Sequence, residues 1–209
     1  WGSLQLGYTE TIGSEALRCA IKKHYKHIEL DEILVCSPGE ANFILMNVML
    51  DAGDHVVCMA PMYQSLYQVA RDIGCRLSFW QPSYNQQGWH YDTAELEKLI
   101  KDDTKLIIIN FPHNPTGFSP EIDEYLHIFE IAKRKGIPVF SDEMYRFLNH
   151  GNNLALPPAC DIYEDAISLW GTAKTFGLAG LRLGWLTTKN KGLLKKIESF
   201  KDYLTICNS

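Results

Sequence analysis

Short apolar runs that alternate with helix-length segments constrain the fold of this chain most strongly. The apolar runs cover residues 33–36, 55–59, 75–80, 106–109, 137–140 and 166–170. Segments with helical character cover residues 14–25, 41–50, 64–73, 92–101 and 121–135. This alternation predicts an α/β fold with a mainly parallel sheet sandwiched by helices. Residues 82–88 are expected to form a polar loop between two such elements.

The composition is that of one globular domain. The chain has 209 residues, of which 46% are hydrophobic, so it can bury a sizeable core. Its formal net charge of -5 argues against a broad nucleic-acid-binding surface. No apolar run reaches the roughly 18 residues of a membrane helix, and no stretch has the order of a signal peptide. We therefore expect a cytoplasmic protein that binds neither nucleic acid nor membranes.

The cysteines and histidines do not indicate a metal site. Six cysteines are scattered through expected strands and helices without a C-x-x-C pair, so buried free thiols are the better interpretation. His24 and His27 lie one helical turn apart, but no carboxylate or cysteine cluster accompanies them. We expect no metal.

Polar residues follow three of the apolar runs. Asn114 opens an Asn-Pro-Thr-Gly motif after residues 106–109, Asp142 and Tyr145 follow residues 137–140, and Lys174 and Arg182 follow residues 166–170. Open parallel sheets bind ligands at the carboxyl ends of their strands. These side chains are therefore expected to line one site.

Lys174 and Arg182 suggest a specific chemistry. Lys174 lies among small residues that leave room for a planar cofactor, and a lysine that bonds an aldehyde must be reachable and able to lose its proton. Arg182, eight residues later, offers a planar fork of donors suited to a phosphate dianion. Taken alone, Lys174 also fits a solvated loop residue, and only the upstream motifs favour the chemical interpretation.

The order Asn-Pro-x-Gly, Asp-x-x-Tyr, then lysine with arginine eight residues later resembles one enzyme family. It is that of the fold-type I aminotransferases dependent on pyridoxal 5′-phosphate (PLP), in the class I/II family to which aspartate aminotransferase belongs. The resemblance spans Tyr8 to about Lys201. It implies PLP as cofactor, amino acid and 2-oxo acid substrates, and a homodimer with shared active sites.

The resemblance also implies roles for single residues. Lys174 would hold PLP as a Schiff base and shuttle the substrate's proton, and Asp142 would keep the pyridine nitrogen protonated. Asn114 and Tyr145 would bind the phenolic oxygen, and Arg182 the phosphate. Two further expectations are that Tyr63 stacks on the ring and that the Asn114–Pro115 and Ala60–Pro61 peptide bonds are cis.

The expected phosphate site departs from the family pattern. Ser37, Pro38 and Gly39 match the turn that supplies backbone N–H groups at a helix N-terminus, but Pro38 has no N–H and Glu40 adds a negative charge. Gly171 stands where many members carry a serine or threonine, and Thr172 is expected to substitute for it. The alternative is that Pro38 and Gly39 form only a turn before a core helix.

Two further expectations concern assembly and extent. Tyr8 resembles the tyrosine that reaches the phosphate of the partner subunit. The chain opens with Trp1-Gly2-Ser3 and ends after an amphipathic segment. We expect residues 1–209 to be the PLP-binding large domain, without the N-terminal arm and the C-terminal small domain that supplies the family's arginine for the substrate carboxylate.

The expected activity is transfer of an amino group from an L-amino acid to a 2-oxo acid. The same residues would serve a β C–S lyase or an aminocyclopropane-carboxylate-synthase-like enzyme, because reaction choice depends on which bond stands perpendicular to the ring. A non-catalytic, ligand-sensing domain of the kind fused to DNA-binding modules is a third alternative. A helix-turn-helix segment before Trp1 would favour it, whereas the retained chemical residues favour an enzyme.

Overall fold

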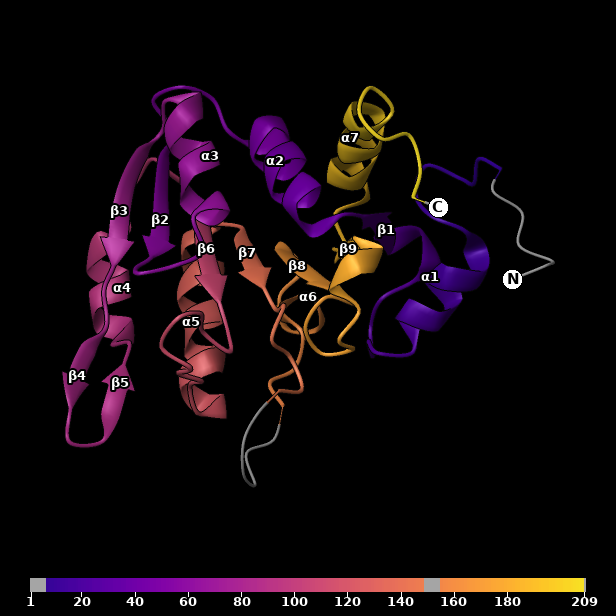
Figure 1. Cartoon of the computed structure of the whole chain (residues 1–209). Coiled ribbons are helices and arrows are strands. Elements are labelled where there is room, and N and C mark those ends of the chain that lie inside the picture. Colours follow the sequence, from indigo (N-terminus) through magenta and orange to yellow (C-terminus); the bar gives the residue numbers. More distant parts are fainter. Residues whose placement is uncertain (1–6, 149–154, 209) are drawn as a thin grey trace.

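One seven-stranded sheet forms the centre of the part of the chain that the computed structural model describes, residues 7–148 and 155–208 (Figure 1). The opening Trp1-Gly2-Ser3 lies outside these residues. The strands are β1 (Ile33–Cys36), β2 (His55–Met59), β3 (Arg76–Trp80), β6 (Thr104–Asn110), β7 (Val139–Asp142), β8 (Ala166–Gly171) and β9 (Gly184–Thr187). Their order is β1-β9-β8-β7-β6-β2-β3; β9 runs antiparallel to β1 and β8 on either side of it, and all the other neighbouring pairs are parallel. The expected mainly parallel sheet is confirmed.

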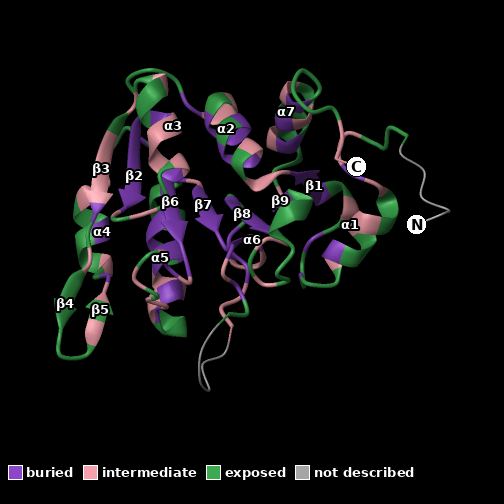
Figure 2. Ribbon diagram, viewed as in Figure 1, coloured by how far each residue is buried: buried purple, intermediate pink, exposed green. Residues whose placement is uncertain are grey.

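Helices cover both faces of the sheet (Figures 1 and 2). They are α1 (Glu15–Lys22), α2 (Pro38–Met49), α3 (Ser65–Ile73), α4 (Thr93–Leu99), α5 (Ile122–Lys135), α6 (Ala159–Ile162) and α7 (Lys191–Lys201), with 3₁₀ turns η1 (Leu30–Glu32) and η2 (Ala179–Leu181). Successive side chains of β2 point to opposite faces of the sheet, as the two-residue period of a strand requires. Val56 packs in the cluster with α2, α3 and α7, whereas Val57 packs in the cluster with α4 and α5.

Helix α2 begins at Pro38, three residues before the predicted start at residue 41. Ser37 caps it: the Ser37 hydroxyl accepts from the Glu40 N–H, and the Glu40 carboxylate accepts from the Ser37 N–H, both at 3.4 Å. Proline suits the first helical position because its missing N–H has no helical partner there. The turn expected at Ser37, Pro38 and Gly39 is therefore part of helix α2. Ser37 is the cap of the helix, and Pro38 and Gly39 lie in its first turn.

The expected polar loop over residues 82–88 is wrong. Strands β4 (Ser83–Asn85) and β5 (Gly88–His90) pair there as an antiparallel hairpin. The rings of Tyr84 and Trp89 meet across it in an edge-on contact with centroids 4.9 Å apart, a cross-strand pair that stabilises such ribbons. Gly88 has φ +104°, which a hairpin turn needs and glycine adopts readily.

The ends of β6, β7 and β8 bring the polar motifs together. In the register of the parallel sheet Asn110 pairs with Asp142, so the loops that follow both strands start at the same edge. The Ala60–Pro61 and Asn114–Pro115 bonds are cis, as expected, and Phe111–Pro112 is a third cis bond. Among the residues described, no helix is both long and apolar enough to cross a membrane.

Candidate active site

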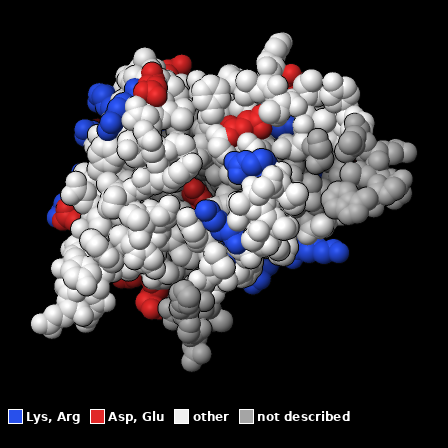
Figure 3. All heavy atoms as spheres, in the orientation of Figure 1, with Lys and Arg blue, Asp and Glu red and all other residues white. Residues whose placement is uncertain are grey.

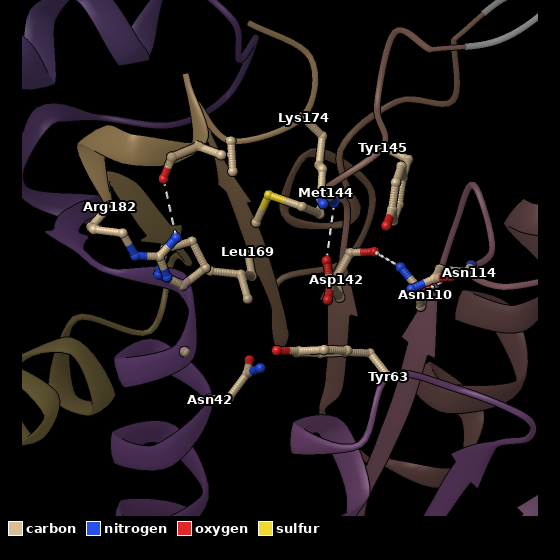
Figure 4. Close-up of a pocket in the computed structure, with 14 residues that line it drawn as sticks. Asn42, Tyr63, Asn110, Asn114, Asp142, Met144, Tyr145, Leu169, Lys174 and Arg182 are labelled. Atoms are coloured by element: carbon tan, nitrogen blue, oxygen red, sulfur yellow. Dashed lines mark hydrogen bonds between the residues drawn. The ribbon is translucent and has the colours of Figure 1, made fainter. Parts of the chain in front are cut away.

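A cavity of about 270 Å³ lies at this carboxyl edge of the sheet. It is lined by Pro38, Gly39, Asn42, Tyr63, Asn110, Asn114, Asp142, Met144, Tyr145, Leu169, Ala173, Lys174, Ala179 and Arg182. Figure 4 shows Lys174, Asp142 and Tyr145 around one space, with Arg182 and Asn114 on opposite sides of it. In the space-filling view, basic and acidic side chains meet at a hollow near the middle of this face (Figure 3).

Asp142, the last residue of β7, supplies a buried carboxyl group to the cavity. Its Oδ1 accepts a hydrogen bond from the Met144 N–H at 3.0 Å. The pKa of Asp142 is raised to about 7, chiefly by burial; the Met144 N–H opposes the shift, and the nearby charge of Glu143 adds to it. A cationic ligand group at this carboxyl would restore its charge, and a protonated pyridine nitrogen is such a group.

Glu143 and Arg146 form a buried pair behind Asp142. Glu143 Oε1 accepts from the Ser168 hydroxyl at 2.6 Å and from the Ala159 N–H at 2.8 Å, and Glu143 Oε2 lies 4.0 Å from Arg146 Nη1. The Arg146 guanidinium also stacks on Trp170, 4.8 Å from the ring centroid. This packing anchors the loop that carries Tyr145.

Lys174 and Tyr145 lie on two loops that are tied together. Lys174 Nζ is 5.9 Å from the centroid of the Tyr145 ring. The next residue, Thr175, donates from its hydroxyl to the Arg146 carbonyl oxygen at 2.6 Å. Burial raises the pKa of Tyr145, with smaller contributions from Asp142 and Tyr63, so its hydroxyl stays a hydrogen-bond donor at neutral pH.

Arg182 follows the η2 turn with a left-handed backbone, φ +52°. For a residue other than glycine this conformation costs about 1 to 3 kcal/mol and is typical of functional sites. Its Nη1 donates to the Ala179 carbonyl oxygen at 3.2 Å, which uses one of five N–H donors. The guanidinium thus lines the cavity and has further N–H donors that a ligand could use.

The N-terminus of α2 meets the cavity at Pro38 and Gly39. Glu40 donates its N–H to the Ser37 hydroxyl, and the Ala41 N–H bonds the Ser37 carbonyl oxygen at 2.9 Å. Within the described part of the chain, the Gly39 N–H has no such bond. The Glu40 carboxylate turns back to the cap, and the Thr205 hydroxyl donates to it at 2.6 Å. The helix therefore offers a positive end to an anion despite Pro38 and Glu40.

Three expected site residues lie outside this lining. Ser37 serves as the helix cap, the Thr172 hydroxyl donates to the Leu183 carbonyl oxygen at 3.1 Å, and Tyr8 is 86% exposed. Their contacts with the cofactor stay predictions. At Gly171, a Cβ would lie 2.8 Å from the Leu183 carbonyl oxygen, so the missing hydroxyl cannot be added there without moving β9.

Sequence reasoning missed Asn42, Asn110 and Met144. Asn110 was the polar residue directly after the apolar run 106–109, and Asn42 interrupts a strongly apolar helix. Both signals were visible but are common for residues without a role. Met144 reads as one more apolar residue, and only the fold places it on the cavity wall.

The cavity presents the chemical groups that PLP requires. Lys174 offers an amine to an aldehyde, Asp142 a carboxyl to a ring nitrogen, and Arg182 with the end of α2 a positive site for phosphate. The buried Asn42 Oδ1 has no hydrogen-bond partner among the residues described, although Asn42 Nδ2 donates to Ser65 Oγ at 2.8 Å. Buried polar atoms are normally paired, so this atom fits a ligand-binding wall. These residues fit the cofactor.

Comparison with known proteins agrees with this arrangement. Aspartate aminotransferase of Sulfurisphaera tokodaii is 31% identical over 92% of this chain and 50% of its own length. Kynurenine–oxoglutarate transaminase 3 of Homo sapiens is 28% identical over 92% and 46%. The crystal structure of a PLP-dependent aminotransferase from Streptococcus suis matches with a TM-score of 0.90 at 29% identity, over 99% of this chain and 54% of that one. The chain thus spans about half the length of these relatives. The family model for aminotransferase class I and II matches residues 3–209, and the chain belongs to that family.

Proposed function

We propose that this chain is the cofactor-binding large domain of an aminotransferase that moves an amino group from an L-amino acid to a 2-oxo acid. Members of its family depend on PLP. The observation that carries the proposal is the buried, cation-seeking carboxyl of Asp142 in one cavity with the Lys174 amine and the Arg182 guanidinium. The retained combination of acid and amine favours an enzyme over the ligand-sensing alternative.

Each side chain has a task in this proposal. PLP, when bound, supplies an electron-withdrawing ring that accepts electrons from the substrate's α-carbon. Asp142 holds the proton on the ring nitrogen, and Asn114 and Tyr145 donate to the phenolic oxygen. Arg182 and the N-terminus of α2 hold the phosphate. Lys174 binds the cofactor and later moves the proton at the substrate's α-carbon.

Isotope transfer tests the proposed reaction. The full-length protein with PLP is given ¹⁵N-labelled L-amino acids, one at a time, together with 2-oxoglutarate. We expect label in newly formed glutamate, read by mass spectrometry, for at least one donor. Release of the label as ammonia with pyruvate would instead indicate a β-elimination enzyme. Binding of amino acids without any turnover would favour the ligand-sensing alternative.

We expect Arg182→Lys to weaken cofactor binding about ten- to hundredfold. A lysine keeps the charge but not the bidentate fork, and each lost charge-assisted hydrogen bond corresponds to about 1.5 to 3 kcal/mol. Equilibrium titration with pyridoxamine 5′-phosphate measures the change. Arg134→Lys, in the last turn of α5 and in a surface ion pair with Glu97 outside the cavity lining, is the matched control. Equal affinity in wild type and Arg182→Lys would place the phosphate elsewhere.

The proposal extends to the assembly and the location of the protein. The side chain of Tyr8 is exposed in the single chain. A side chain that contacts the phosphate of a partner subunit must be exposed when that partner is absent, so this supports a homodimer with shared active sites. Ser37 and Thr172 remain candidate phosphate contacts, because Pro38 and Ala173 beside them line the cavity. A cytoplasmic location stays a prediction.

A further inference from the structure

Asn110 occupies a central place among the proposed site residues. It is the last residue of β6, only 1% of its surface is exposed, and it lines the cavity. Figure 4 shows it beside Asp142 and Asn114. The proposed chemistry gives Asn110 no task of its own, so its burial at the cavity needs another explanation.

Both ends of the Asn110 amide are bonded to neighbours that carry the proposed chemistry. Asn110 Nδ2 donates to the main-chain carbonyl oxygen of Asp142 at 2.9 Å. Asn110 Oδ1 accepts from the main-chain N–H of Asn114 at 2.9 Å. One side chain therefore joins the end of β7 to the loop after β6. A carboxylate lacks the donor that this arrangement needs, and a hydroxyl is too short to reach both partners.

The loop after β6 is also held through His113, whose ring bonds the Tyr91 hydroxyl at 3.1 Å and the Thr116 hydroxyl at 2.7 Å, but these contacts do not involve Asn114. It contains Pro112 and Pro115, neither of which has an N–H to donate. Its internal main-chain bonds join His113 to Phe118 and Gly117 to His113, and neither involves Asn114. Among the described residues, the bond from the Asn114 N–H to Asn110 is thus the hydrogen bond that ties Asn114 itself to the sheet.

We propose that Asn110 is a positioning residue that holds Asn114 and Asp142 at a fixed separation across the cofactor site. This inference rests on the proposed function. Asn114 and Asp142 are assigned to two different edges of one rigid ring, so an error in their separation weakens both contacts together. A misplacement of about 1 Å can cost on the order of a hundredfold in rate.

A purely structural role would give a different result from a positioning role. Thr104 offers a matched control, because it lies at the opposite end of the same strand and is also buried. Its hydroxyl bonds His55 Nδ1 and the Lys101 N–H, each at 2.8 Å. Thr104→Val therefore removes one buried and one partly buried hydrogen bond from β6, as Asn110→Ala does, but at the opposite end of the strand from the cavity.

Equilibrium titration of the full-length protein with pyridoxamine 5′-phosphate, which binds without a covalent link, tests the proposal. We expect Asn110→Ala and Asn110→Asp to bind at least tenfold more weakly than wild type, and Thr104→Val to bind within twofold of it. Urea unfolding of the same proteins reports their stability. If Asn110→Ala does not fold, the Asn110→Asp variant, which keeps the size and the acceptor, decides. Affinity within twofold of wild type in a folded Asn110 variant would overturn the proposal.

A double-mutant cycle shows whether Asn110 acts through Asn114. If it does, Asn114→Ala weakens binding in wild type but by less than about twofold in the Asn110→Ala background. Multiplicative losses would show that the two residues act independently and would refute the positioning role. The outcome is separable from the proposed function, because a wild-type protein that fails to bind pyridoxamine 5′-phosphate at all contradicts that function and not the role of Asn110.

Discussion

Borohydride reduction of the full-length protein with PLP is expected to attach the cofactor to Lys174 and to no other lysine. Lys174 alone among the lysines of the described chain lines the cavity, where it lies near Asp142 and Tyr145. A peptide map by mass spectrometry identifies the labelled residue. Labelling at Lys189 or Lys191 instead would remove the central assignment.

Lys174→Ala is expected to lower turnover roughly 10⁴-fold, because the variant loses both the covalent link and the group that moves the α-proton. It should still bind pyridoxamine 5′-phosphate, since Arg182 and Asp142 remain. Lys196→Ala, on the exposed face of α7, should leave both turnover and labelling unchanged. Retained turnover in Lys174→Ala would show that the proton moves by another route.

The parts of the fold that follow from local pattern could be predicted from the sequence. Strands β1 and β2 have the predicted bounds because each is a short apolar run between turn signals. Strand β9 escaped prediction. It has four residues, all buried, so it shows no alternation, and it pairs antiparallel with β8 only because the chain turns back at Arg182. Pairing of this kind is a property of the sheet rather than of the segment.

In the candidate site, too, some residues could be predicted from local sequence pattern, whereas others depend on contacts made only in the folded chain. Asp142, Asn114 and Lys174 could be placed at one edge because parallel strands end on the same side of a sheet. Asn110 could not be recognised, since its two bonds join residues 4 and 32 positions away and exist only in the folded chain. Asn42 is similar, because its significance is a buried oxygen without a partner, which no sequence pattern reveals.

The structure changes the expectation for the proposed phosphate site without removing it. Pro38 and Glu40 were departures that weakened the match to an anion site. In the structure Pro38 starts the helix at its most favourable position, and Glu40 is engaged in the cap. The groups left to attract the proposed phosphate are the Gly39 N–H, the helix end and Arg182. Because fewer N–H donors are available to the proposed phosphate, the Arg182 guanidinium is expected to contribute a large share of the cofactor affinity.

Asp142→Asn is expected to reduce turnover by roughly a thousandfold, because the amide cannot hold a proton on the ring nitrogen by charge. Asp142→Glu should retain more activity than Asp142→Asn, since the charge is kept. Steady-state kinetics at saturating PLP measures both. Asp72→Asn, on the exposed side of α3, is the control and should match wild type. Near-normal turnover in Asp142→Asn would show that the carboxyl serves only the fold.

The same substitution should stabilise the protein without cofactor. The pKa of Asp142 rises from 3.8 to about 7 on folding, so the folded state binds more protons than the unfolded state between these values. Stability therefore falls as pH rises through this window, and the full penalty applies above pH 7.

An asparagine at position 142 avoids the cost of burying a charged carboxylate and still accepts a hydrogen bond from the Met144 N–H. Urea unfolding at pH 8 should show Asp142→Asn more stable by roughly 2 to 4 kcal/mol, a gain that disappears near pH 4. A carboxyl that destabilises the empty protein yet is required for turnover is one retained for its ligand. Equal stability of the two proteins at pH 8 would contradict this account.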